Sequence, residues 1–554
     1  MNQLTGAQLL VQLLERQGIR TVAGIPGGAI LPFYDALSAS AIHHVLVRHE
    51  QGAGFIAQGM ARASGRPAVC IASSGPGATN LLTAIADASL DSIPLIAITG
   101  QVPLSMIGTD AFQEVDIYGM SVPVTKHNFL VRSAGELFEV IPAAFRIAMS
   151  GRPGPVLIDV PKDVQNQVVQ FEDFPAPAEA ERPGAVEQSE IDEAAALINE
   201  AKRPVFYIGG GAIHASASAL AVLLAEQAGM PVVMTLMALG VIPLDHPLSI
   251  GMLGMHGARY TNYVLEEADL IVSVGARFDD RAIGRAAQFC PNAKIVHIDA
   301  DRSEFHKIKN AHVTIHGDVR IALEALLPKV KPNLRKRWLA HVESLKSRFP
   351  MQYPGIDDPR SPYGLVHAVA ETAGRDAIVA TDVGQHQMWV AQSYPFLRPR
   401  HWLTSGGLGT MGFGVPAAIG ASLAFPEKTV VCFTGDGSIM MNIQELATLV
   451  EQHLNIKIVL LDNNALGLVC QQQKLFYGKR LFASEYTLRP DFMKIAEGFG
   501  LPAVNLDDAD NPRALLSQVF GTAGPCLIRA SVAREECVYP MVPPGAANTE
   551  MIGG

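Results

Sequence analysis

Asp436 and Asn463 are the residues whose chemical types and spacing point most directly to a reaction site. Asp436 stands in the run Gly435–Ser438, which follows an apolar, β-branched stretch typical of a buried strand, and Asn463 follows a second such stretch. Apolar residues at helical spacing separate the two stretches, so the segment is predicted to form a βαβ unit. Such units are right-handed and parallel, which brings both strand ends to one edge of a sheet. A carboxylate and an amide oxygen at that edge suit Mg²⁺.

The competing interpretation is a solvated loop of ordinary turn residues, and for an isolated Gly-Asp-Gly it would be the better one. Asn442 and Glu445, near the expected start of the intervening helix, have the spacing of a capping box. The glycines at 435 and 437 let the backbone turn sharply and approach a ligand. On these residues alone, both the turn and the metal-site interpretations stay open.

Composition and charge limit the class of protein. The chain has 554 residues, which predicts three or four domains of roughly 150 residues each. It is 49% hydrophobic and 17% charged, enough for several buried cores, and its net charge of −10 argues against a nucleic-acid partner. The six cysteines are scattered without metal-ligand spacing, and no apolar run is long enough for a membrane span. With no secretory signal or transit pattern, we expect a cytoplasmic enzyme with reduced thiols.

Strands alternate with helices along the chain, so the predicted fold class is α/β, with three doubly wound, mostly parallel-sheet domains. We expect domains at 1–170, 188–330 and 362–535, linkers at 171–187 and 331–361, and a C-terminal tail at 536–554. The first linker is rich in Pro, Ala and Glu, which is typical of a semi-rigid spacer.

Two further features have both a functional and a structural interpretation. Glu50 follows a predicted strand and starts an apolar helix, where it could act on a ligand or merely cap the helix; taken alone, the cap is the simpler interpretation. In the middle domain, strand ends bear Gly209–Gly211, Asp299 and Asp318, and dinucleotide sites use glycine for phosphate approach and an acid for ribose hydroxyls. The G-x-G-x-x-G pattern is absent, so a purely structural domain stays open.

Taken together, these residues resemble the acetohydroxyacid synthase (acetolactate synthase) catalytic-subunit family of thiamine diphosphate enzymes. The resemblance covers nearly the whole chain and rests on the Gly435–Gly437 turn with Asn463, and on R-H-E-Q-G-A-G, S-S-G-P-G-A-T-N, G-T-D-A-F-Q-E-V-D, G-A-R-F-D-D-R and G-Q-H-Q-M-W. It implies two thiamine diphosphate domains, the first for the pyrimidine and the last for the diphosphate and Mg²⁺, flanking a central FAD-associated domain.

The resemblance implies roles for particular residues. Glu50 would hydrogen-bond the cofactor's aminopyrimidine ring, and Mg²⁺ would be held by Asp436, Asn463 and the Ala465 carbonyl. The implied thiamine diphosphate residues are Glu50, Gly384, Gln385, His386, Gly409, Met411, Gly435, Asp436, Gly437, Ser438, Asn463, Leu466 and Gly467. The implied FAD residues are Arg152, Gly209, Gly210, Gly211, Thr235, Leu236, Gly254, Met255, His256, Gly275, Arg277, Asp279, Arg281, Asp299 and Asp318.

The implied reaction decarboxylates pyruvate and condenses the hydroxyethyl unit with pyruvate or 2-ketobutyrate, the first common step of branched-chain amino acid biosynthesis. Residues around the reacting centre would be Glu50, Gly28, Phe112, Gln113, Lys162, Arg281 and Met411. Arg281 would pair with the acceptor carboxylate, because its guanidinium binds carboxylates bidentately; the alternative is a structural salt bridge with Asp279 or Asp280. The family also implies a homodimer with its site at the interface, FAD without net redox chemistry, and a small regulatory subunit.

The chain departs from the family pattern at two positions. Gln472 stands where many members have the Trp that contributes to preference for 2-ketobutyrate, so we expect pyruvate to be used as acceptor nearly as readily. The triplet Asp462-Asn463-Asn464 stands where Asn-Asn-Glu is commoner, although the ligand position itself keeps its Asn463. The rival interpretations are another thiamine enzyme, such as a pyruvate oxidase, a decarboxylase, a glyoxylate carboligase or an FAD-free acetolactate synthase, and a non-catalytic relative. Glu50 argues against the carboligase, and G-A-R-F-D-D-R argues against the FAD-free enzymes.

Overall fold

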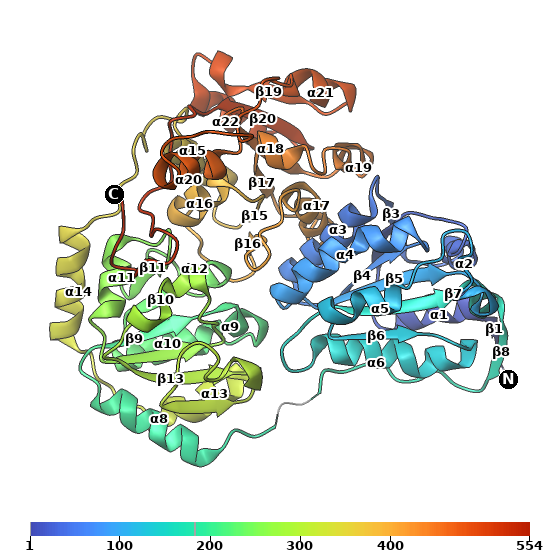
Figure 1. The fold of residues 1–554 in the computed structure, drawn as a ribbon, viewed down its shortest axis with the longest axis horizontal. Coiled ribbons are helices and arrows are strands. Elements are labelled where there is room, and N and C mark those ends of the chain that lie inside the picture. The colour runs from blue at the N-terminus through green and yellow to red at the C-terminus, as the bar shows by residue number, and fades with distance from the viewer. Residues whose placement is uncertain (1, 182–183, 554) are drawn as a thin grey trace.

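Three parallel β-sheets of six strands each organise the chain (Figure 1). The computed structural model describes residues 2–181 and 184–553. Neighbouring strands run parallel in all three sheets, and a separate antiparallel pair, β1 with β8, closes the first domain. The predicted α/β architecture with three doubly wound, mostly parallel domains is confirmed.

The N-terminal sheet has the strand order β3-β2-β4-β5-β7-β6. Its central strands read as continuous apolar runs because helices cover both faces. The elements are β1 (Asn2–Thr5), α1 (Gly6–Arg16), β2 (Thr21–Gly24), α2 (Leu31–Ser38), β3 (His43–Leu46), α3 (Glu50–Ser64), β4 (Ala68–Ala72), α4 (Pro76–Leu90), β5 (Leu95–Gln101), α5 (Ile117–Ser121), β6 (His127–Leu130), α6 (Leu137–Met149), β7 (Val156–Pro161), α7 (Lys162–Asn166) and β8 (Val168–Phe171).

The middle sheet has the order β11-β10-β9-β12-β13-β14, in which the chain starts at β9 and winds outward in both directions. This 3-2-1-4-5-6 arrangement is the one that dinucleotide-binding sheets use. The elements are α8 (Gln188–Glu200), β9 (Pro204–Ile208), α9 (Gly210–His214), α10 (Ser218–Ala228), β10 (Val232–Met234), β11 (Ser249–Met252), α11 (Arg259–Glu266), β12 (Leu270–Val274), α12 (Asp280–Ile283), β13 (Lys294–Asp299), β14 (Val313–His316), α13 (Val319–Leu326) and the linker helix α14 (Lys336–Arg348).

The C-terminal sheet, β16-β15-β17-β18-β20-β19, repeats the winding order of the N-terminal sheet strand for strand. The first and last domains are therefore related sheets flanking a differently wound third. The elements are α15 (Pro362–Ala373), β15 (Ile378–Thr381), α16 (Gln385–Ser393), β16 (Trp402–Leu403), α17 (Gly414–Ala424), β17 (Val430–Gly435), α18 (Asp436–Ile439), α19 (Glu445–Glu451), β18 (Ile456–Asp462), α20 (Gly467–Phe476), α21 (Phe492–Gly498), β19 (Ala503–Asn505), α22 (Pro512–Gly521) and β20 (Cys526–Ser531).

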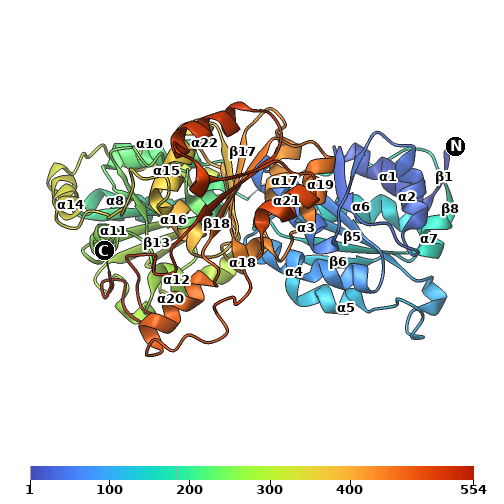
Figure 2. The same cartoon turned by 90° about the horizontal axis from the view of Figure 1, so that it is seen from above.

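The buried cores join the domains to one another. One core contains Ile56 and Met60 of α3 together with Ile419 of α17, so these two helices bind the N-terminal to the C-terminal domain (Figure 2). A second core combines residues of the middle and C-terminal sheets, such as Val272 and Val459. Each Å² of apolar surface buried in this way contributes about 25 cal/mol of stabilising free energy, which is the main term that holds the domains together.

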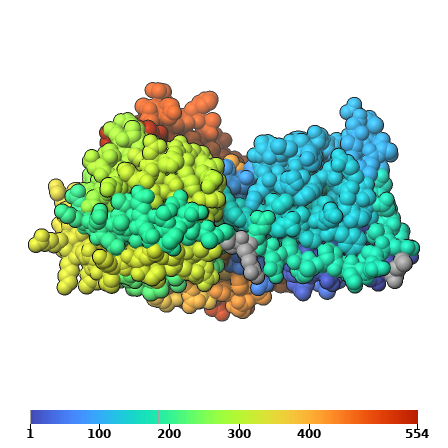
Figure 3. Space-filling model, turned by 90° about the horizontal axis from the view of Figure 1, so that it is seen from below, coloured from blue at the N-terminus to red at the C-terminus, as the bar shows by residue number. Residues whose placement is uncertain are grey.

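Two segments outside the sheets join or cover the domains. The described residues of 171–187 are mostly exposed and lead from the N-terminal to the middle domain (Figure 3). The C-terminal tail returns to the middle domain, where the Val542 amide donates to the Met255 carbonyl (2.8 Å) and Asn548 Nδ2 donates to the Ala282 carbonyl (2.8 Å). In the part of the chain that the structure describes, no helix is long and apolar enough to cross a bilayer.

Candidate active site

The carboxyl ends of β15, β17 and β18 form one side of the candidate site. These strands are adjacent and parallel, and Gly435 pairs with Leu461, so Asp436 and Asn463 emerge at the same edge of the sheet. The winding direction reverses between β15 and β17, which is where open α/β sheets bind ligands. The structure therefore brings the ends of β17 and β18 together, and Asp436 and Asn463 with them.

Asp436 is buried without a cationic side-chain partner among the described residues. Burial, and then the nearby Asp462 carboxylate, raise its pKa to about 6, and the amides of Gly437 and Ala465 only partly offset this. Asn463 lies beside it and accepts the Ala465 amide through Oδ1 (3.0 Å). A divalent cation bound here would lower the pKa of Asp436, because it stabilises the ionised carboxylate. Such cations also take oxygen ligands.

Glycines keep this end of the site open. A Cβ on Gly437 would lie 3.6 Å from Met411 Cε and 3.0 Å from Leu466 Cδ2, so the turn lies directly against both side chains. A Cβ on Gly467 would lie 2.0 Å from Gln385 Oε1 and 2.5 Å from Asn463 Nδ2. The predicted residues from four separate stretches of the chain thus converge on one cradle.

His386 faces the same cradle from α16. A Cβ on Gly384 or on Gly435 would lie about 3 Å from its ring, at 2.9 and 3.0 Å. Burial lowers the pKa of His386 to about 3, so the ring is neutral, and its buried Nε2 has no hydrogen-bond partner among the described residues. An unpaired buried polar atom beside two glycines suits a polar ligand group.

Glu50 is the first residue of α3 and is half-buried. Its Oε2 accepts a hydrogen bond from Asn80 Nδ2 (2.9 Å), which fixes the direction of the carboxylate. The helix is capped by His49, whose Nδ1 accepts the Gln51 amide, so the interpretation of Glu50 as a cap is wrong. The carboxylate is left free to act on a ligand.

No hydrogen bond among the described residues joins Glu50 to the Gly435–Ser438 turn. Glu50 Oε2 accepts from Asn80 of the N-terminal domain, and the Ser438 hydroxyl donates to the Val383 carbonyl of the C-terminal domain. The segment 109–116, which follows β5, is also open to solvent, with Phe112 87% exposed and Gln113 exposed beside it. Gly28 is exposed after β2, and Lys162 is half-buried at the start of α7.

Arg281 extends from α12 toward solvent. Its side chain is 62% exposed, and Nη1 lies 3.7 Å from the exposed Asp280 carboxylate. Exposed ion pairs of this kind contribute little to stability. The pairing with Asp280 therefore leaves the guanidinium available for a substrate carboxylate. Asp279 does not pair with it but caps α12 by accepting the amides of residues 281 and 282.

The middle-domain residues assigned to FAD have several local roles. Gly209 and Gly211 lie against Gly275. The ends of β9 and β12 are therefore so close that a side chain at either glycine would clash with Gly275. Burial raises the pKa of Asp299 to about 6, and Asp318 caps α13. Of the remaining predicted FAD residues, Arg152 lies in the N-terminal domain before β7 and pairs with Asp301 (3.0 Å) and Glu304 (3.1 Å), whereas the others follow strands of the middle sheet at their carboxyl ends.

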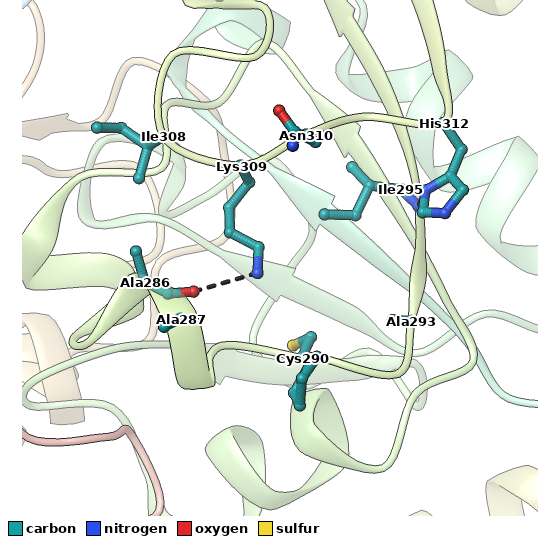
Figure 4. Close-up of a pocket in the computed structure, with 10 residues that line it drawn as sticks. Ala286, Ala287, Cys290, Ala293, Ile295, Ile308, Lys309, Asn310 and His312 are labelled. Carbon is teal, nitrogen blue, oxygen red and sulfur yellow. Dashed lines mark hydrogen bonds between the residues drawn. The ribbon is translucent and has the colours of Figure 1, made fainter.

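Two surface cavities of about 400 and 500 Å³ lie elsewhere. The smaller is lined by Cys290, Ile295 and Lys309, whose Nζ donates to the Ala286 carbonyl (Figure 4). Both cavities lie at the amino ends of the middle sheet, whereas the predicted residues lie at carboxyl ends. Neither cavity belongs to the candidate site.

Sequence reasoning missed three residues that border the cradle. The Tyr486 hydroxyl would lie 2.7 Å from a Cβ on Gly437, Gln471 accepts from Gln385 Nε2 (3.1 Å), and the buried Asp382 accepts the Gly412 amide (2.6 Å). Asp382 follows a strand end and could have been found by that signal. Tyr486 lies in a loop and does not follow a predicted strand, so nothing in the sequence indicated its position.

The predicted capping box at Asn442 and Glu445 is wrong. α19 begins at Glu445 itself, and Gln444 precedes it without a side-chain cap. Asn442 Nδ2 donates instead to the Gly412 carbonyl (2.8 Å), and the Glu445 carboxylate contacts the N-terminal domain. Tertiary partners have displaced the local motif.

The fold and the cradle define a thiamine pyrophosphate enzyme. Residues 4–120, 191–326 and 382–530 match the N-terminal TPP-binding, central and C-terminal TPP-binding domains of that class. Over 552 residues the chain is 61% identical to the acetolactate synthase isozyme 1 large subunit of Escherichia coli (strain K12), covering 100% of this chain and 98% of the relative.

Other relatives agree. The isozyme 2 large subunit of the same organism is 46% identical, covering 99% of both chains, and acetolactate synthase 1, chloroplastic, of Zea mays is 45% identical over 99% of this chain and 88% of the relative. The chain belongs to the acetolactate synthase large-subunit family of thiamine pyrophosphate enzymes.

Proposed function

We propose that the chain performs acetolactate synthesis at a site built from Asp436, Asn463 and the surrounding glycines of one copy and Glu50 of a second copy. The observation that carries this proposal is the cradle itself, in which Gly437 lies against Met411 and Leu466 beside the buried Asp436. Its donor 2-keto acid is pyruvate, and pyruvate or 2-ketobutyrate is the acceptor.

Mg²⁺ would be held by the Asp436 carboxylate, Asn463 Oδ1 and the Ala465 carbonyl. The residues fit the ion because all three are oxygen donors at one edge and the carboxylate has no competing cation among the described residues. The diphosphate would lie against the glycines at 384, 409, 435 and 437, with Gln385, His386, Ser438, Leu466 and Gly467 around it.

Thiamine diphosphate supplies the electron sink for decarboxylating one 2-keto acid and transferring the remaining two-carbon unit to another. The chain's own residues bind and orient it. Glu50, oriented by Asn80, would hold a proton at a pyrimidine ring nitrogen, which is acid–base work relayed through the cofactor. Met411, an adaptable apolar side chain, would support the cofactor from the cradle and exclude water.

The substrate residues come from both sides of the proposed interface. Arg281 would bind the acceptor carboxylate, since its pairing with Asp280 is long and exposed. Gly28, Phe112, Gln113 and Lys162 would line the reacting centre from the N-terminal domain.

FAD is proposed for the middle domain, where it would have a structural rather than a redox role. The sheet has the dinucleotide-binding strand order, and the close approach of Gly209 and Gly211 to Gly275 marks the point where the winding reverses. Asp299 at the end of β13 would contact a ribose, and Arg277 after β12 would contact a phosphate.

A second copy would cover exposed apolar residues around the site. Phe112, Met440, Met441, Val469 and Phe482 all expose large apolar surface, which single soluble chains rarely gather. We propose a homodimer as the smallest active unit, and a small regulatory subunit because relatives are named large subunits. The six free cysteines suit a reducing compartment, so the proposed location is the cytoplasm.

The testing experiment is product analysis of the pure protein with pyruvate, thiamine diphosphate and Mg²⁺, with and without FAD. We expect FAD-dependent acetolactate from wild type and a loss of roughly 100-fold or more in Glu50→Gln. The exposed Glu497→Gln is the matched control and should keep wild-type activity. Acetate with peroxide, or acetaldehyde, would instead indicate an oxidase or a decarboxylase.

A further inference from the structure

Glu445 of the C-terminal domain contacts the backbone immediately before Glu50. Its Oε1 accepts the amides of Arg48 and His49, each at 3.0 Å, and its Oε2 accepts the Thr448 hydroxyl (2.6 Å). The side chain is fully buried, with 0% exposure. A carboxylate from one domain thus binds the chain at the entry to a helix of another.

This contact has the form of a helix cap supplied across domains. The amides at and before the start of a helix lack intrahelical acceptors, and a negative charge there is favoured by the helix dipole. Charge-assisted hydrogen bonds to backbone amides are stronger than neutral ones. Glu445 therefore fixes the path of the backbone into α3 and with it the first turn, where Glu50 lies.

Gln51 and Gly52, which follow Glu50, also contact the segment that carries Glu445. A Cβ on Gly52 would lie 2.6 Å from Glu445 Oε1, so a larger residue here would displace the Glu445 carboxylate. Asn442 Nδ2 donates to Gln51 Oε1 (3.2 Å). Residues 48, 49, 51 and 52, on both sides of Glu50, thus all contact the segment that carries Glu445.

That segment belongs to the βαβ unit of the proposed metal site. α19 begins at Glu445 and joins β17, which ends at Gly435, to β18, which ends at Asp462. In a dimer with shared sites, Asp436 of one chain serves one site and Glu50 of the same chain serves the other. Glu445 is then a direct link, within one chain, between the two sites.

We propose that Glu445 is a positioning residue that sets the orientation of the Glu50 carboxylate; this rests on the proposed role of Glu50 as the group that exchanges a proton with the cofactor. Simple packing would be served better by an apolar side chain, because burying a carboxylate has a large desolvation cost. Burial raises the pKa of Glu445 accordingly, and its hydrogen bonds to Thr448, Arg48 and His49 only partly offset this.

The test measures the rate of hydrogen–deuterium exchange at the reactive carbon of bound thiamine diphosphate in the Mg²⁺- and FAD-loaded enzyme, together with kcat and KM. Misplacing a catalytic group by about 1 Å costs up to roughly 100-fold in rate. For Glu445→Ala we expect the exchange rate and kcat to fall by the same factor, roughly 10- to 100-fold. The KM for pyruvate and the affinity for thiamine diphosphate should stay within about threefold of wild type, since the proposed binding residues are untouched.

Glu445→Gln keeps an oxygen that can accept both amides and should retain most of the exchange rate. Thr448→Val, which only frees Oε2, should give an intermediate loss and serves if Glu445→Ala does not fold. Lys457→Met is the matched control, because it removes another buried polar contact, to the Thr522 carbonyl (2.7 Å), and Lys457 makes no hydrogen bond to the described residues 48–52. It should lower stability and leave the exchange rate unchanged.

Unchanged exchange in both Glu445→Ala and Thr448→Val, or equal losses in Glu445→Gln and Glu445→Ala, would overturn the proposal. Glu50→Gln is measured beside them. If Glu50→Gln itself leaves exchange at the wild-type rate, the role proposed for Glu50 fails, which is a separate result from a failure of Glu445.

Discussion

Gly59 of α3 and Gly420 of α17 lie where the two helices cross, each against the backbone of the other helix. A Cβ on Gly59 would lie 2.1 Å from the Ala417 carbonyl oxygen, and a Cβ on Gly420 would lie 2.0 Å from that of Ile56. α3 begins with Glu50, and α17 follows the loop that carries Met411. The crossing therefore joins the two thiamine diphosphate domains of one chain at the helices nearest to both halves of the site.

Gly59→Ala should loosen this crossing. The added methyl group must push apart two backbones, and overpacking of this kind costs about 1–3 kcal/mol. We expect a lower urea midpoint and weaker thiamine diphosphate binding, measured by denaturation and titration. Gly498→Ala, whose Cβ would meet nothing within 4 Å, is the control and should be neutral; equal midpoints for the two variants would contradict the close packing.

Arg62 should be essential for the stability of the loop before Met411. Its Nη2 binds the buried Asp87 (3.0 Å) and Asp91 (2.8 Å), and Asp91 also accepts the Gly407 amide (2.7 Å). Arg62→Met leaves two buried carboxylates without their cation, which costs about 3–5 kcal/mol. The urea midpoint should fall strongly and thiamine diphosphate should bind more weakly.

The control for that change is Arg320→Met. Arg320 pairs with Glu324 on the surface, both more than half exposed, and such pairs contribute less than about 1 kcal/mol. Equal destabilisation by the two substitutions would show that the buried cluster is not the stronger contact.

Asp159 predicts a pH dependence of stability. Burial raises its pKa from 3.8 to about 7, although Thr99 and Gln101 donate hydrogen bonds to it. The folded state favours the protonated acid, so the carboxyl makes its full contribution to the free energy of unfolding below about pH 4. This contribution is lost as pH rises to about 7, and the free energy of unfolding falls by up to roughly 1.4 kcal/mol per pH unit.

Asp159→Asn should remove this slope. Urea midpoints of wild type and variant should therefore draw apart in favour of the variant as pH rises from about 4 to about 7. The exposed Asp510→Asn should follow wild type at every pH. Parallel curves for wild type and Asp159→Asn would show that this carboxyl does not control the trend.

Gln472 predicts the acceptor preference. It lies half-buried on α20, five residues after Gly467 of the proposed cradle, and offers no indole surface to a longer acceptor. At equal concentrations of pyruvate and 2-ketobutyrate, Gln472→Trp should raise the share of acetohydroxybutyrate over wild type. A large excess of acetohydroxybutyrate from wild type would contradict this, and pyruvate alone serves as the control for intact catalysis.

The strand-end positions of the proposed site residues were predictable because strand ends and glycine turns are local signals. Gly435–Ser438, Asn463 and Glu50 all follow apolar, β-branched runs that read clearly as strands. The same logic predicted three doubly wound sheets, which the structure confirms.

Contacts between distant segments were not predictable. Glu445 reads locally as part of a cap, yet its partners are Arg48 and His49, which no periodicity relates to it. The Arg62 cluster likewise depends on how α3 and α4 meet the loop before Met411. Such partners are determined by the packing of whole domains rather than by neighbouring residues.

The most direct test of the shared site mixes two inactive chains, Glu50→Gln and Asp436→Asn. If each site takes Glu50 from one chain and Asp436 from the other, a mixed dimer has one intact site. Random pairing should then restore about a quarter of wild-type acetolactate formation after the chains are dissociated and reassociated together. No recovery above the activity of either variant alone would show that Glu50 and Asp436 do not act at one site between two chains.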